Sequence, residues 1–280
     1  MPEQIVYFVH ISDTHIGPTA DYRRHGHTPL PCAEKMVDVI NNLPVQPDFV
    51  IHTGDVVYDP DPAAYRLAAQ TFSRLKAPIY YVVGNHDRAR DIHHFLSMGP
   101  KEDVTDDGDT LSYTFEMKGY RFLTLDARGP DEIDPHGLLS DTQLEVAQHE
   151  AKADGPPLTV FTHFPVLPLN AIWMDANMLT LNGPQLHDAL RPAGERLRGV
   201  FHGHVHQHMQ TRRDGILYAC VASVFAQFTA WPTDLNVGFD PEHEPGYAFV
   251  HLLSEQTIIH QHTFPRPESG RERVTEDDRP

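Results

Sequence analysis

The sequence predicts an α/β fold, and two observations lead to this prediction. Along the first third of the chain, apolar runs rich in β-branched and aromatic residues alternate with segments whose apolar residues recur at helical spacing. This alternation is typical of parallel βαβ units. Beyond residue 110 the pattern changes to a hairpin and isolated strand-like runs, which adds antiparallel strands to the expected fold.

Three strand–helix units are expected in the first third of the chain. In the first predicted helix, Met36, Val37, Ile40 and Leu43 recur at the spacing of one helix face. The second predicted helix is rich in alanine. In chain order the elements are strand Ile5–Ile11, helix Pro31–Leu43, strand Phe49–His52, helix Pro62–Leu75, strand Ile79–Val83 and helix Ala89–Leu96.

The rest of the chain is predicted to hold one helix and several strands. Lys118-Gly119 is a two-residue hairpin signal between two β runs. Ser140 and Gln143 have the spacing of a capping box, which marks the start of a helix. The expected elements are strands Ser112–Met117 and Tyr120–Asp126, helix Ser140–Ala153, strands Leu158–Phe161 and Val200–Phe201, and a second antiparallel set of Ile216–Val221, Tyr247–Leu253 and Thr257–His262.

Two long stretches without a regular pattern are candidate site loops, because loops of this length in a compact domain are more often functional than accidental. The first carries basic and imidazole side chains that could touch a substrate phosphate or lie on a surface loop. The second carries an indole and thioethers that could stack on a base or pack the loop down. They are Gly17–Leu30, with Arg24, His25 and His27, and Phe164–Pro184, with Trp173, Met174 and Met178.

One folded domain is expected over residues 1–263, because 280 residues with 40% hydrophobic content suffice for a large core. Residues 264–280 are poor in apolar side chains and rich in proline and charge, so a disordered tail is expected there. Cys32 and Cys220 cannot form a disulfide framework or a thiolate zinc site. We expect both thiols to be reduced and partly buried.

The negative net charge of the chain argues against some classes of binding partner, namely those that are themselves polyanions. Acidic residues outnumber basic ones 39 to 22, the formal net charge is −17, and no run of lysine or arginine occurs. Long nucleic acids and anionic membranes attract basic surfaces, so neither is an expected partner. The N-terminus lacks a signal-peptide pattern and no apolar stretch approaches about 20 residues, so we expect a cytoplasmic protein. The oligomeric state is open, with a homo-oligomer as one option.

Five short blocks rich in histidine and aspartate follow predicted strands. Their side chains are imidazole, carboxylate and carboxamide without thiolate, a set that suits borderline or hard divalent metals. Side chains at the carboxyl ends of neighbouring strands converge on one crevice, so the pattern predicts two metal ions in one pocket. The blocks are Asp13-Thr14-His15, Gly54-Asp55, Gly84-Asn85-His86-Asp87, Thr162-His163 and Gly203-His204-Val205-His206.

Two neighbouring dications repel each other, so their site needs an anionic ligand that both share. A carboxylate can bridge two ions, and Asp55, preceded by the small Gly54, is the natural bridge. Asp13 and His15 lie two positions apart at a predicted strand end, which would point them the same way. The other candidate ligands are the imidazoles of His163, His204 and His206 and the carbonyl oxygen of Asn85.

Only two carboxylates, Asp13 and Asp55, are among these candidate ligands. Two dications, the two carboxylates and one bridging hydroxide sum to a formal charge of about +1. Because bound ions are the largest local charges in such a site, an acidic protein can hold a phosphate there. The expected partner is therefore a small phosphate ester.

The order and spacing of the five blocks resemble the calcineurin-like metallophosphoesterase superfamily over about residues 5–210. The run His10-Ile11-Ser12-Asp13-Thr14-His15 is similar to the bacterial class III cyclic-nucleotide and glycerophosphodiester phosphodiesterases. The resemblance implies a four-layer α/β/β/α sandwich of two mixed β-sheets flanked by helices. It also implies a binuclear phosphoesterase that hydrolyses small phosphodiesters by attack of a metal-bridging hydroxide.

The resemblance assigns a role to each block residue. One ion would be held by Asp13, His15, Asp55 and His206, and the other by Asp55, Asn85, His163 and His204. His86 would lie by the leaving group as a proton donor, and Asp87 would orient His86 or a neighbouring ligand. The ligand types leave the metal open among manganese, iron, zinc and cobalt.

Two alternatives compete with a diesterase. A phosphomonoesterase of broad specificity would use the same centre. A non-catalytic scaffold with this fold would have lost ligands or His86, and all of them are present here. Tyr58 and Asp59 depart from the residues usual after the second block, and Thr162 stands where many relatives carry a histidine, so the substrate mouth is expected to differ.

Overall fold

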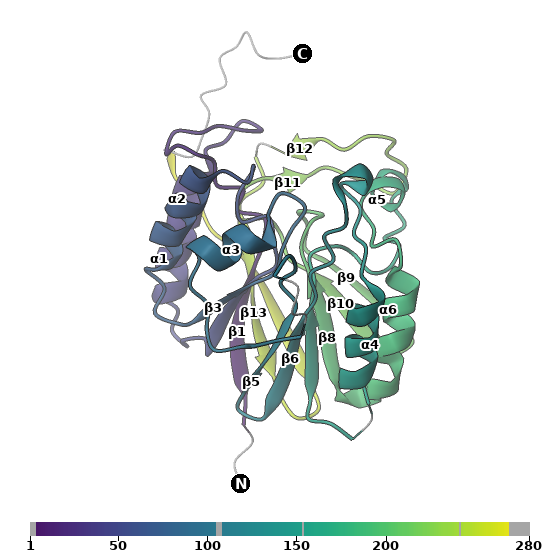
Figure 1. Cartoon of the computed structure of the whole chain (residues 1–280). Coiled ribbons are helices and arrows are strands. Elements are labelled where there is room, and N and C mark those ends of the chain that lie inside the picture. Colours follow the sequence, from purple (N-terminus) through teal and green to yellow (C-terminus); the bar gives the residue numbers. More distant parts are fainter. Residues whose placement is uncertain (1–3, 105–107, 153, 241, 269–280) are drawn as a thin grey trace.

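The computed structural model describes residues 4–104, 108–152, 154–240 and 242–268. Two large β-sheets pack face to face, and helices cover the outer face of each sheet (Figure 1). Both sheets contain parallel and antiparallel pairs of strands. The predicted four-layer α/β/β/α sandwich of two mixed sheets is confirmed.

The first sheet is built from both ends of the chain. Its elements and their helices are β1 (Val6–Ile11), α1 (Pro29–Asn41), β2 (Phe49–His52), α2 (Pro62–Phe72), β3 (Ile79–Tyr81), α3 (Ala89–Phe95), β13 (Gly246–Leu252) and β14 (Thr257–Thr263). The strand order is β14-β13-β1-β2-β3. The predicted βαβ units form its parallel part, β1-β2-β3, and β13 adds to β1 in the antiparallel direction.

The second sheet comes from the middle of the chain. Its elements are β4 (Glu102–Asp103), β5 (Tyr113–Met117), β6 (Tyr120–Thr124), α4 (Asp141–Glu150), β7 (Leu158–Phe161), α6 (Gly183–Leu190), β8 (Leu197–His202), β9 (Met209–Arg213) and β10 (Ile216–Cys220). The strand order is β4-β5-β6-β7-β8-β10-β9. Strands β6, β7, β8 and β10 run parallel, so their carboxyl ends share one end of the sheet.

Four smaller elements lie outside the two sheets and their main helices. They are the 3₁₀ helices η1 (Asp131–Ile133) and η2 (Arg191–Arg196), the short helix α5 (Ile172–Asn177), and a two-stranded ribbon of β11 (Gln227–Phe228) and β12 (Phe239–Asp240). The ribbon and α5 lie at the same end of the molecule (Figure 1). This is the end at which β1, β2, β7 and β8 finish.

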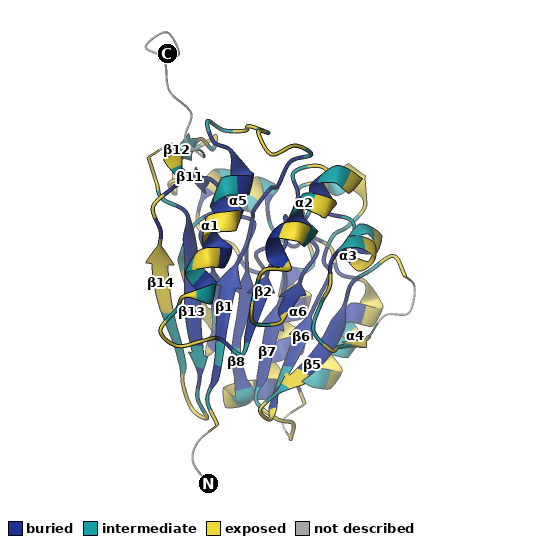
Figure 2. Cartoon of the chain, turned by 90° about the vertical axis from the view of Figure 1, so that its left-hand side faces the viewer, coloured by how far each residue is buried: buried dark blue, intermediate teal, exposed yellow. Residues whose placement is uncertain are grey.

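Aromatic side chains join the two sheets. The ring centroid of Phe8 in β1 lies 5.6 Å from that of Phe161 in β7 and 5.3 Å from that of Phe201 in β8. Phe49 in β2 lies 5.0 Å from Phe122 in β6. All five rings are buried in the layer between the sheets, where Figure 2 shows the central strands of both sheets, such as β1, β2, β7 and β8, in dark blue. Such pairs add about 0.5–1.5 kcal/mol each beyond the burial of their area, so they hold the two sheets in one fixed arrangement.

The two local sequence signals are confirmed. Lys118 and Gly119 have φ values of 50° and 78°, the left-handed pair that a tight two-residue hairpin requires. Ser140 caps α4, because its hydroxyl accepts a hydrogen bond from the Gln143 amide while the Gln143 side chain accepts one from the Ser140 amide. Both signals act within a few residues, which is why the sequence alone predicts them.

The predicted second antiparallel set is confirmed for two of its three strands. β13 and β14 pair antiparallel with each other, but they complete the first sheet beside β1. β10 does not belong to this set, because it pairs with β8 in parallel and with β9 antiparallel inside the second sheet. Pairing partners are decided by packing across the whole chain, and periodicity along the sequence carries no information about them. Helices α5 and α6 also begin inside or next to the stretch expected to be a loop, residues 164–184.

The disordered tail is expected from residue 264 onward, but the chain is still folded at this position. Phe264 and Arg266 are 3% and 5% exposed, so this part of the expected tail belongs to the folded domain. The Arg266 guanidinium donates hydrogen bonds to the main-chain carbonyls of Phe225 (2.6 Å) and His243 (2.8 Å). Residues 269–280 of the expected tail lie outside the described residues.

No helix in the described part of the chain combines the length and the apolar character that crossing a membrane requires.

Candidate metal centre

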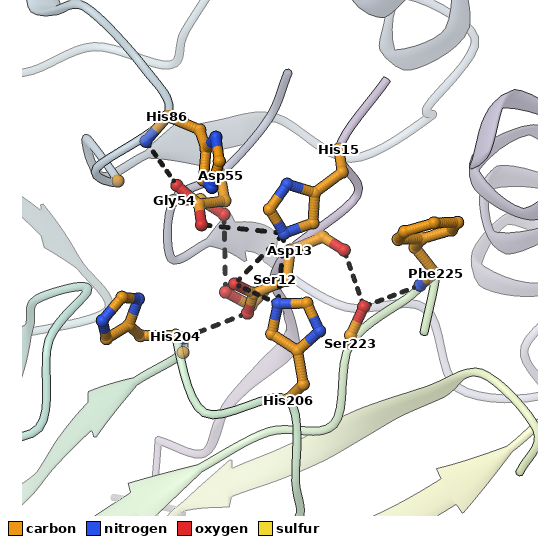
Figure 3. Close-up of polar contacts among 12 residues, drawn as sticks. Ser12, Asp13, His15, Gly54, Asp55, His86, His204, His206, Ser223 and Phe225 are labelled. Atoms are coloured by element: carbon orange, nitrogen blue, oxygen red, sulfur yellow. Dashed lines mark hydrogen bonds and ion pairs between the residues drawn. The ribbon is translucent and has the colours of Figure 1, made fainter. Parts of the chain in front are cut away.

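The five His/Asp-rich blocks meet at one end of the two sheets. They follow β1, β2 and β3 of the first sheet and β7 and β8 of the second, each at the carboxyl end of its strand. Figure 3 shows the side chains of Asp13, His15, Asp55 and His206, from the loops after β1, β2 and β8, pointing toward one another. His15 and His206, 191 positions apart in sequence, come within 3.1 Å. The crevice at the strand ends is where open α/β sheets bind ligands.

Most of the candidate ligands have a left-handed backbone conformation, which sets the direction of their side chains. The φ values are 57° at Asp13, 46° at His15, 55° at Asp55, 72° at His204 and 48° at His206. This conformation is uncommon for residues other than glycine and clusters at functional sites. Asp13 and His15 therefore lie in a turn after β1 rather than on the strand end expected from their spacing. They still converge, with His15 Nε2 3.9 Å from Asp13 Oδ1.

Two of the block glycines make room for ligand side chains. Gly54 has a φ of +102°, and a Cβ there would lie 2.5 Å from Nδ1 of His163. A Cβ at Gly84 would lie 2.1 Å from Oδ1 of Asp55. Both distances are too short for real contacts, so any larger residue would displace a candidate ligand. This close approach accounts for the glycines in the second and third blocks.

Hydrogen bonds between loops fix the position of Asp13. Its amide donates to the carbonyl of Gly54 (3.0 Å), which ties the β1 loop to the β2 loop. Its own carbonyl accepts a hydrogen bond from the Ser223 hydroxyl (2.7 Å), and that hydroxyl in turn accepts one from the Phe225 amide (2.8 Å) (Figure 3). Ser223 thus connects the metal-ligand loop with the wall of the cavity.

The candidate ligand atoms fall into overlapping groups. In each group the atoms lie within 4.8 Å of one another, and the groups are Asp13, His15 and His206; Asp55, His163 and His204; and His15, Asp55 and His86. Oδ2 of Asp55 lies 3.6 Å from His15 Nε2 and 3.3 Å from His163 Nε2. Asp55 therefore lies between the first two groups, where a carboxylate shared by two ions would have to be.

Main-chain carbonyls orient three of the imidazoles. Their ring hydrogen bonds run from His163 Nδ1 to Thr53 O (2.6 Å), from His204 Nε2 to Pro135 O (2.9 Å) and from His206 Nδ1 to Ala226 O (2.5 Å). A carbonyl only accepts, so the nitrogen facing it carries the proton. In the neutral ring the other nitrogen is then unprotonated, and its lone pair is directed at the centre. A metal ligand requires such a lone pair.

These unprotonated nitrogens face each other. His163 Nε2 lies 3.1 Å from His204 Nδ1, so neutral rings would bring two lone pairs together unless a cation or a proton lies between them. Burial alone would lower the pKa of His163, but the Asp55 carboxylate outweighs burial and raises this pKa to about 9. A proton thus takes the place of a cation in the metal-free protein. This arrangement fits a metal centre.

Two oxygen atoms of the centre also lack hydrogen bonds. Among the described residues, neither Oδ1 of Asp13 nor Oδ1 of Asn85 accepts one. Burial would raise the pKa of Asp13, but His206 outweighs burial and holds this pKa well below its ordinary value, so the carboxylate is ionised. Buried polar atoms nearly always have a partner, and a cation would supply one to both oxygens.

His86 lies at the edge of the centre. Its Nδ1 donates to the main-chain carbonyl of Tyr58 (2.6 Å), and its ring lies 5.0 Å from that of His15. Its amide donates to Oδ1 of Asp55 (2.9 Å) (Figure 3). These contacts leave Nε2 for the cavity.

Asp87 does not contact His86 through its carboxylate in any of the described hydrogen bonds. The carboxylate accepts from the amides of Val56, Val57 and Gly84 instead. It therefore joins the second block to the third and lies behind Asp55 rather than in the cavity. Of the two expected roles, orienting His86 or a neighbouring ligand, these contacts favour the second, because they hold the backbone next to Asp55.

A cavity of about 160 Å³ opens above the candidate ligands. Its floor is formed by His15, Asp55, Asn85, His86, His204 and His206, and its walls by His25, Tyr58, Pro135, Trp173, Met178, Phe225, Phe228 and Phe239. The walls include Pro135, Phe225 and Phe239, which sequence reasoning missed. No local signal marks these residues, because they come from irregular segments that only the folded chain brings together.

The loop residues left open by the sequence are now placed. His25 lines the cavity, the Arg24 guanidinium lies 4.8 Å over the Tyr58 ring, and His27 is buried. Trp173 and Met178 also line the cavity, so both long loops belong to the site.

The family of the chain follows from a sequence comparison. The model of the calcineurin-like phosphoesterase family matches residues 6–208, a range that contains all five blocks. The chain belongs to this family. Calcineurin-like phosphoesterases take their name from phosphoester chemistry, and the match agrees with the clusters of aspartate and histidine at the strand ends.

Curated relatives of this phosphoesterase are similar over most of their length. The 3′,5′-cyclic adenosine monophosphate phosphodiesterase CpdA of Pseudomonas aeruginosa is 28% identical over 250 residues, which is 88% of this chain and 85% of the relative. The glycerophosphodiester phosphodiesterase GpdQ of Enterobacter lignolyticus is 27% identical over 258 residues, 91% of this chain and 90% of the relative.

A solved structure shares the fold. GAP50, the anchor in the inner membrane complex of Plasmodium, superposes with a TM-score of 0.51 at 13% identity, over 94% of this chain and 90% of that chain. At this identity the likeness concerns the fold alone.

Proposed function

We propose that this calcineurin-like phosphoesterase is a metal-dependent phosphodiesterase that hydrolyses small phosphodiesters of the cyclic-nucleotide or glycerophosphodiester type. The observation that carries the proposal is the position of Asp55, whose Oδ2 lies 3.6 Å from His15 Nε2 and 3.3 Å from His163 Nε2. The names of the curated relatives support the type of ester.

The chain provides ligands for two ions that share Asp55. We assign Asp13, His15, Asp55 and His206 to one ion, and Asp55, Asn85, His163 and His204 to the other. When bound, such ions supply a nucleophile from water at neutral pH and offset the negative charge of the phosphoryl oxygens. In the neutral rings of His163, His204 and His206, the main-chain carbonyls hold the proton on the other nitrogen and leave the ligand nitrogen free for an ion.

His86 is the proposed proton donor to the leaving group. Its Nδ1–H is committed to the carbonyl of Tyr58, so only Nε2 can face an ester bound in the cavity. In the protonated ring, Nε2–H can donate to the departing alkoxide. A positioned acid of this kind contributes about 10²–10⁴ in rate.

The cavity favours a diester over a monoester. Two dications, Asp13, Asp55 and a nucleophilic hydroxide sum to a formal charge of about +1, which one negative charge on a diester balances. A monoester dianion would leave excess negative charge. Among the described residues that line the cavity there is no lysine or arginine to offset it.

Three further properties remain predictions. The ligand types admit manganese, iron, zinc or cobalt. A cytoplasmic location is an expectation that cell fractionation would check. Light scattering would decide the oligomeric state, for which a homo-oligomer is one option.

A substrate panel tests the proposal. Metal-loaded protein should hydrolyse bis(p-nitrophenyl) phosphate with a higher kcat/KM than p-nitrophenyl phosphate, and should cleave cyclic AMP or a glycerophosphodiester. A large preference for the monoester would make the protein a phosphomonoesterase. Absence of all hydrolysis with both ions bound would favour the non-catalytic scaffold.

A further inference from the structure

The walls of the cavity include aromatic side chains that the proposed hydrolysis does not use. Phe228 and Phe239 are a cross-strand pair of the β11–β12 ribbon. Trp173 and Met178, at helix α5 and its C-terminal end, line the same cavity, as does Phe225 from the loop before the ribbon. In Figure 1 the ribbon and α5 lie at the same end of the molecule.

Packing holds these rings in place. Phe228 stacks on the imidazole of His206 with centroids 4.5 Å apart and planes inclined by 4°. Phe239 meets Phe228 edge to face at 4.9 Å. Phe228 and Trp173 both pack against one small apolar cluster, which comprises Ala171, Met174, Met178, Val205 and Cys220. The ribbon and α5 are therefore supported by the same residues, and the rings are fixed before a ligand binds.

Three of these rings are only half-buried. Phe228, Phe239 and Trp173 are neither buried nor fully exposed, so each keeps part of its surface open, whereas Phe225 is 1% exposed. Apolar surface left in contact with water costs about 25 cal/mol per Å², which a ligand with a complementary apolar group would recover.

One side chain already displays the geometry of a ring bound to this wall. His25 stacks on Phe239 with centroids 3.5 Å apart and planes inclined by 13°. His25 is at the tip of a tight turn in which Arg24 and His27 exchange two main-chain hydrogen bonds of 2.9 Å. Both central residues of the turn, His25 and Gly26, have positive φ values, 49° and 76°. The face of Phe239 thus accepts a flat heteroaromatic ring beside the metal centre, and a bound base would take the place of His25 there.

The wall discriminates between the two kinds of ester arm. Phe225, Phe228 and Phe239 offer no side-chain hydrogen-bond donor or acceptor. A glycerol arm would lose water from its hydroxyl groups here without compensation, which is costly. A nucleobase would instead stack on the rings, an interaction that contributes to binding of every base type.

We propose that the aromatic wall, defined as Trp173, Phe225, Phe228 and Phe239, is a subsite for a planar ring on one ester arm of the substrate. Nucleoside-type diesters are then preferred to glycerol diesters. This inference rests on the proposed function of the centre, because it takes the phosphate of the ester to lie on the floor of the cavity.

A matched pair of ligands, one with a base and one without, measures the contribution of the base to binding. Adenosine 5′-monophosphate and ribose 5-phosphate differ only in the base, and their dissociation constants for the metal-loaded full-length protein are measured by calorimetry. We expect the base to tighten binding by about tenfold to a hundredfold, the order of base–aromatic stacking. Dissociation constants within a factor of about two would overturn the subsite.

Variants locate the effect on the wall. Phe239→Ala should abolish most of the tenfold or larger difference, and Phe239→Leu, which keeps an apolar side chain but no flat face, should abolish it too. Trp173→Ala tests the part of the wall that α5 supplies if the ribbon variants fail to fold. Trp231→Ala is the matched control, because Trp231 is 72% exposed in the loop of the same ribbon and does not line the cavity. A difference that survives both Phe239→Leu and Trp173→Ala would contradict the proposal.

Hydrolysis of bis(p-nitrophenyl) phosphate in the same preparations separates the two proposals. Absence of a base effect in the wild-type protein, with hydrolysis intact, would disprove only the aromatic subsite. A base effect without any hydrolysis would disprove the phosphodiesterase function and leave the subsite in place.

Discussion

Asp55 is the residue on which the centre depends most. It has a left-handed backbone, its Oδ1 accepts the amide of His86 at 2.9 Å, and its Oδ2 faces His15 and His163. Asp87 holds the next amide of the chain, that of Val56, from behind. These contacts fix the carboxylate between the two ligand groups before any ion binds.

Replacing Asp55 should therefore remove metal. We expect Asp55→Ala to lose at least one of two ions per chain, because the shared anion that offsets their repulsion is gone. Elemental analysis after dialysis measures this directly. Asp59→Ala, a nearby exposed acid outside the cavity, should keep both ions. Two ions per chain in Asp55→Ala would exclude the bridge.

Replacing His86 should separate catalysis from metal binding. His86→Asn should retain both ions while kcat falls by about 10²–10⁴, because the leaving group loses its proton donor. His93→Asn, on the exposed face of α3, serves as the control and should leave kcat unchanged. Loss of an ion in His86→Asn would make this residue a ligand, a role that its position within 4.8 Å of His15 and Asp55 also allows.

The sequence predicts which residues are candidate ligands, but it does not predict the backbone conformations that direct their side chains. Every block follows a strand, as expected, but Asp13 and His15 are directed by positive φ values rather than by a strand end. His204 and His206, two positions apart, belong to different ligand groups. Spacing cannot predict this, because the backbone conformation between them is set by contacts with distant loops, such as the hydrogen bond from the His204 amide to Asp13.

At the scale of elements, sequence signals that span a few residues predict the structure correctly, whereas the pairing of distant strands is not predicted correctly. The βαβ units, the hairpin at Lys118-Gly119 and the cap at Ser140 rest on residues close in sequence, and all are present. The partner of β10 and the burial of Phe264 depend on surfaces that form only when the chain folds. For the same reason, the aromatic ribbon beside the metal centre has no signature in the sequence.

The segment after β14 should support the cavity wall. Arg266→Met in the full-length chain removes charge-assisted hydrogen bonds to the carbonyls of Phe225 and His243. We expect a loss of about 2–3 kcal/mol in the free energy of unfolding, measured by denaturant titration. Arg212→Met, on the exposed strand β9, should change it by less than about 0.5 kcal/mol. Equal stability of the two variants would show that the segment is not part of the folded unit.

At the scale of the whole molecule, the centre joins the two sheets. Asp13, His15 and Asp55 come from loops of the first sheet, whereas His163, His204 and His206 come from the second. Ions bound by both sets would therefore link the sheets at one end, in addition to the aromatic contacts between their faces.

Metal removal should lower thermal stability as well as activity. An ion present at 100 times its Kd adds about 2.7 kcal/mol to the folded state, which corresponds to a Tm shift of roughly 5–10 °C for a domain of this size. Scanning calorimetry before and after treatment with a chelator measures the shift. Re-addition of metal should restore both Tm and hydrolysis, and Asp55→Ala should show a smaller shift. An unchanged Tm in the wild-type protein would mean that the ions do not bind the folded state in preference to the unfolded chain.

Anomalous diffraction from crystals of metal-loaded protein tests the binuclear centre most directly. We predict two peaks about 3.5–4 Å apart, the spacing of two-metal sites, with the Asp55 carboxylate in contact with both. A single peak, or two peaks without Asp55 between them, would contradict the account.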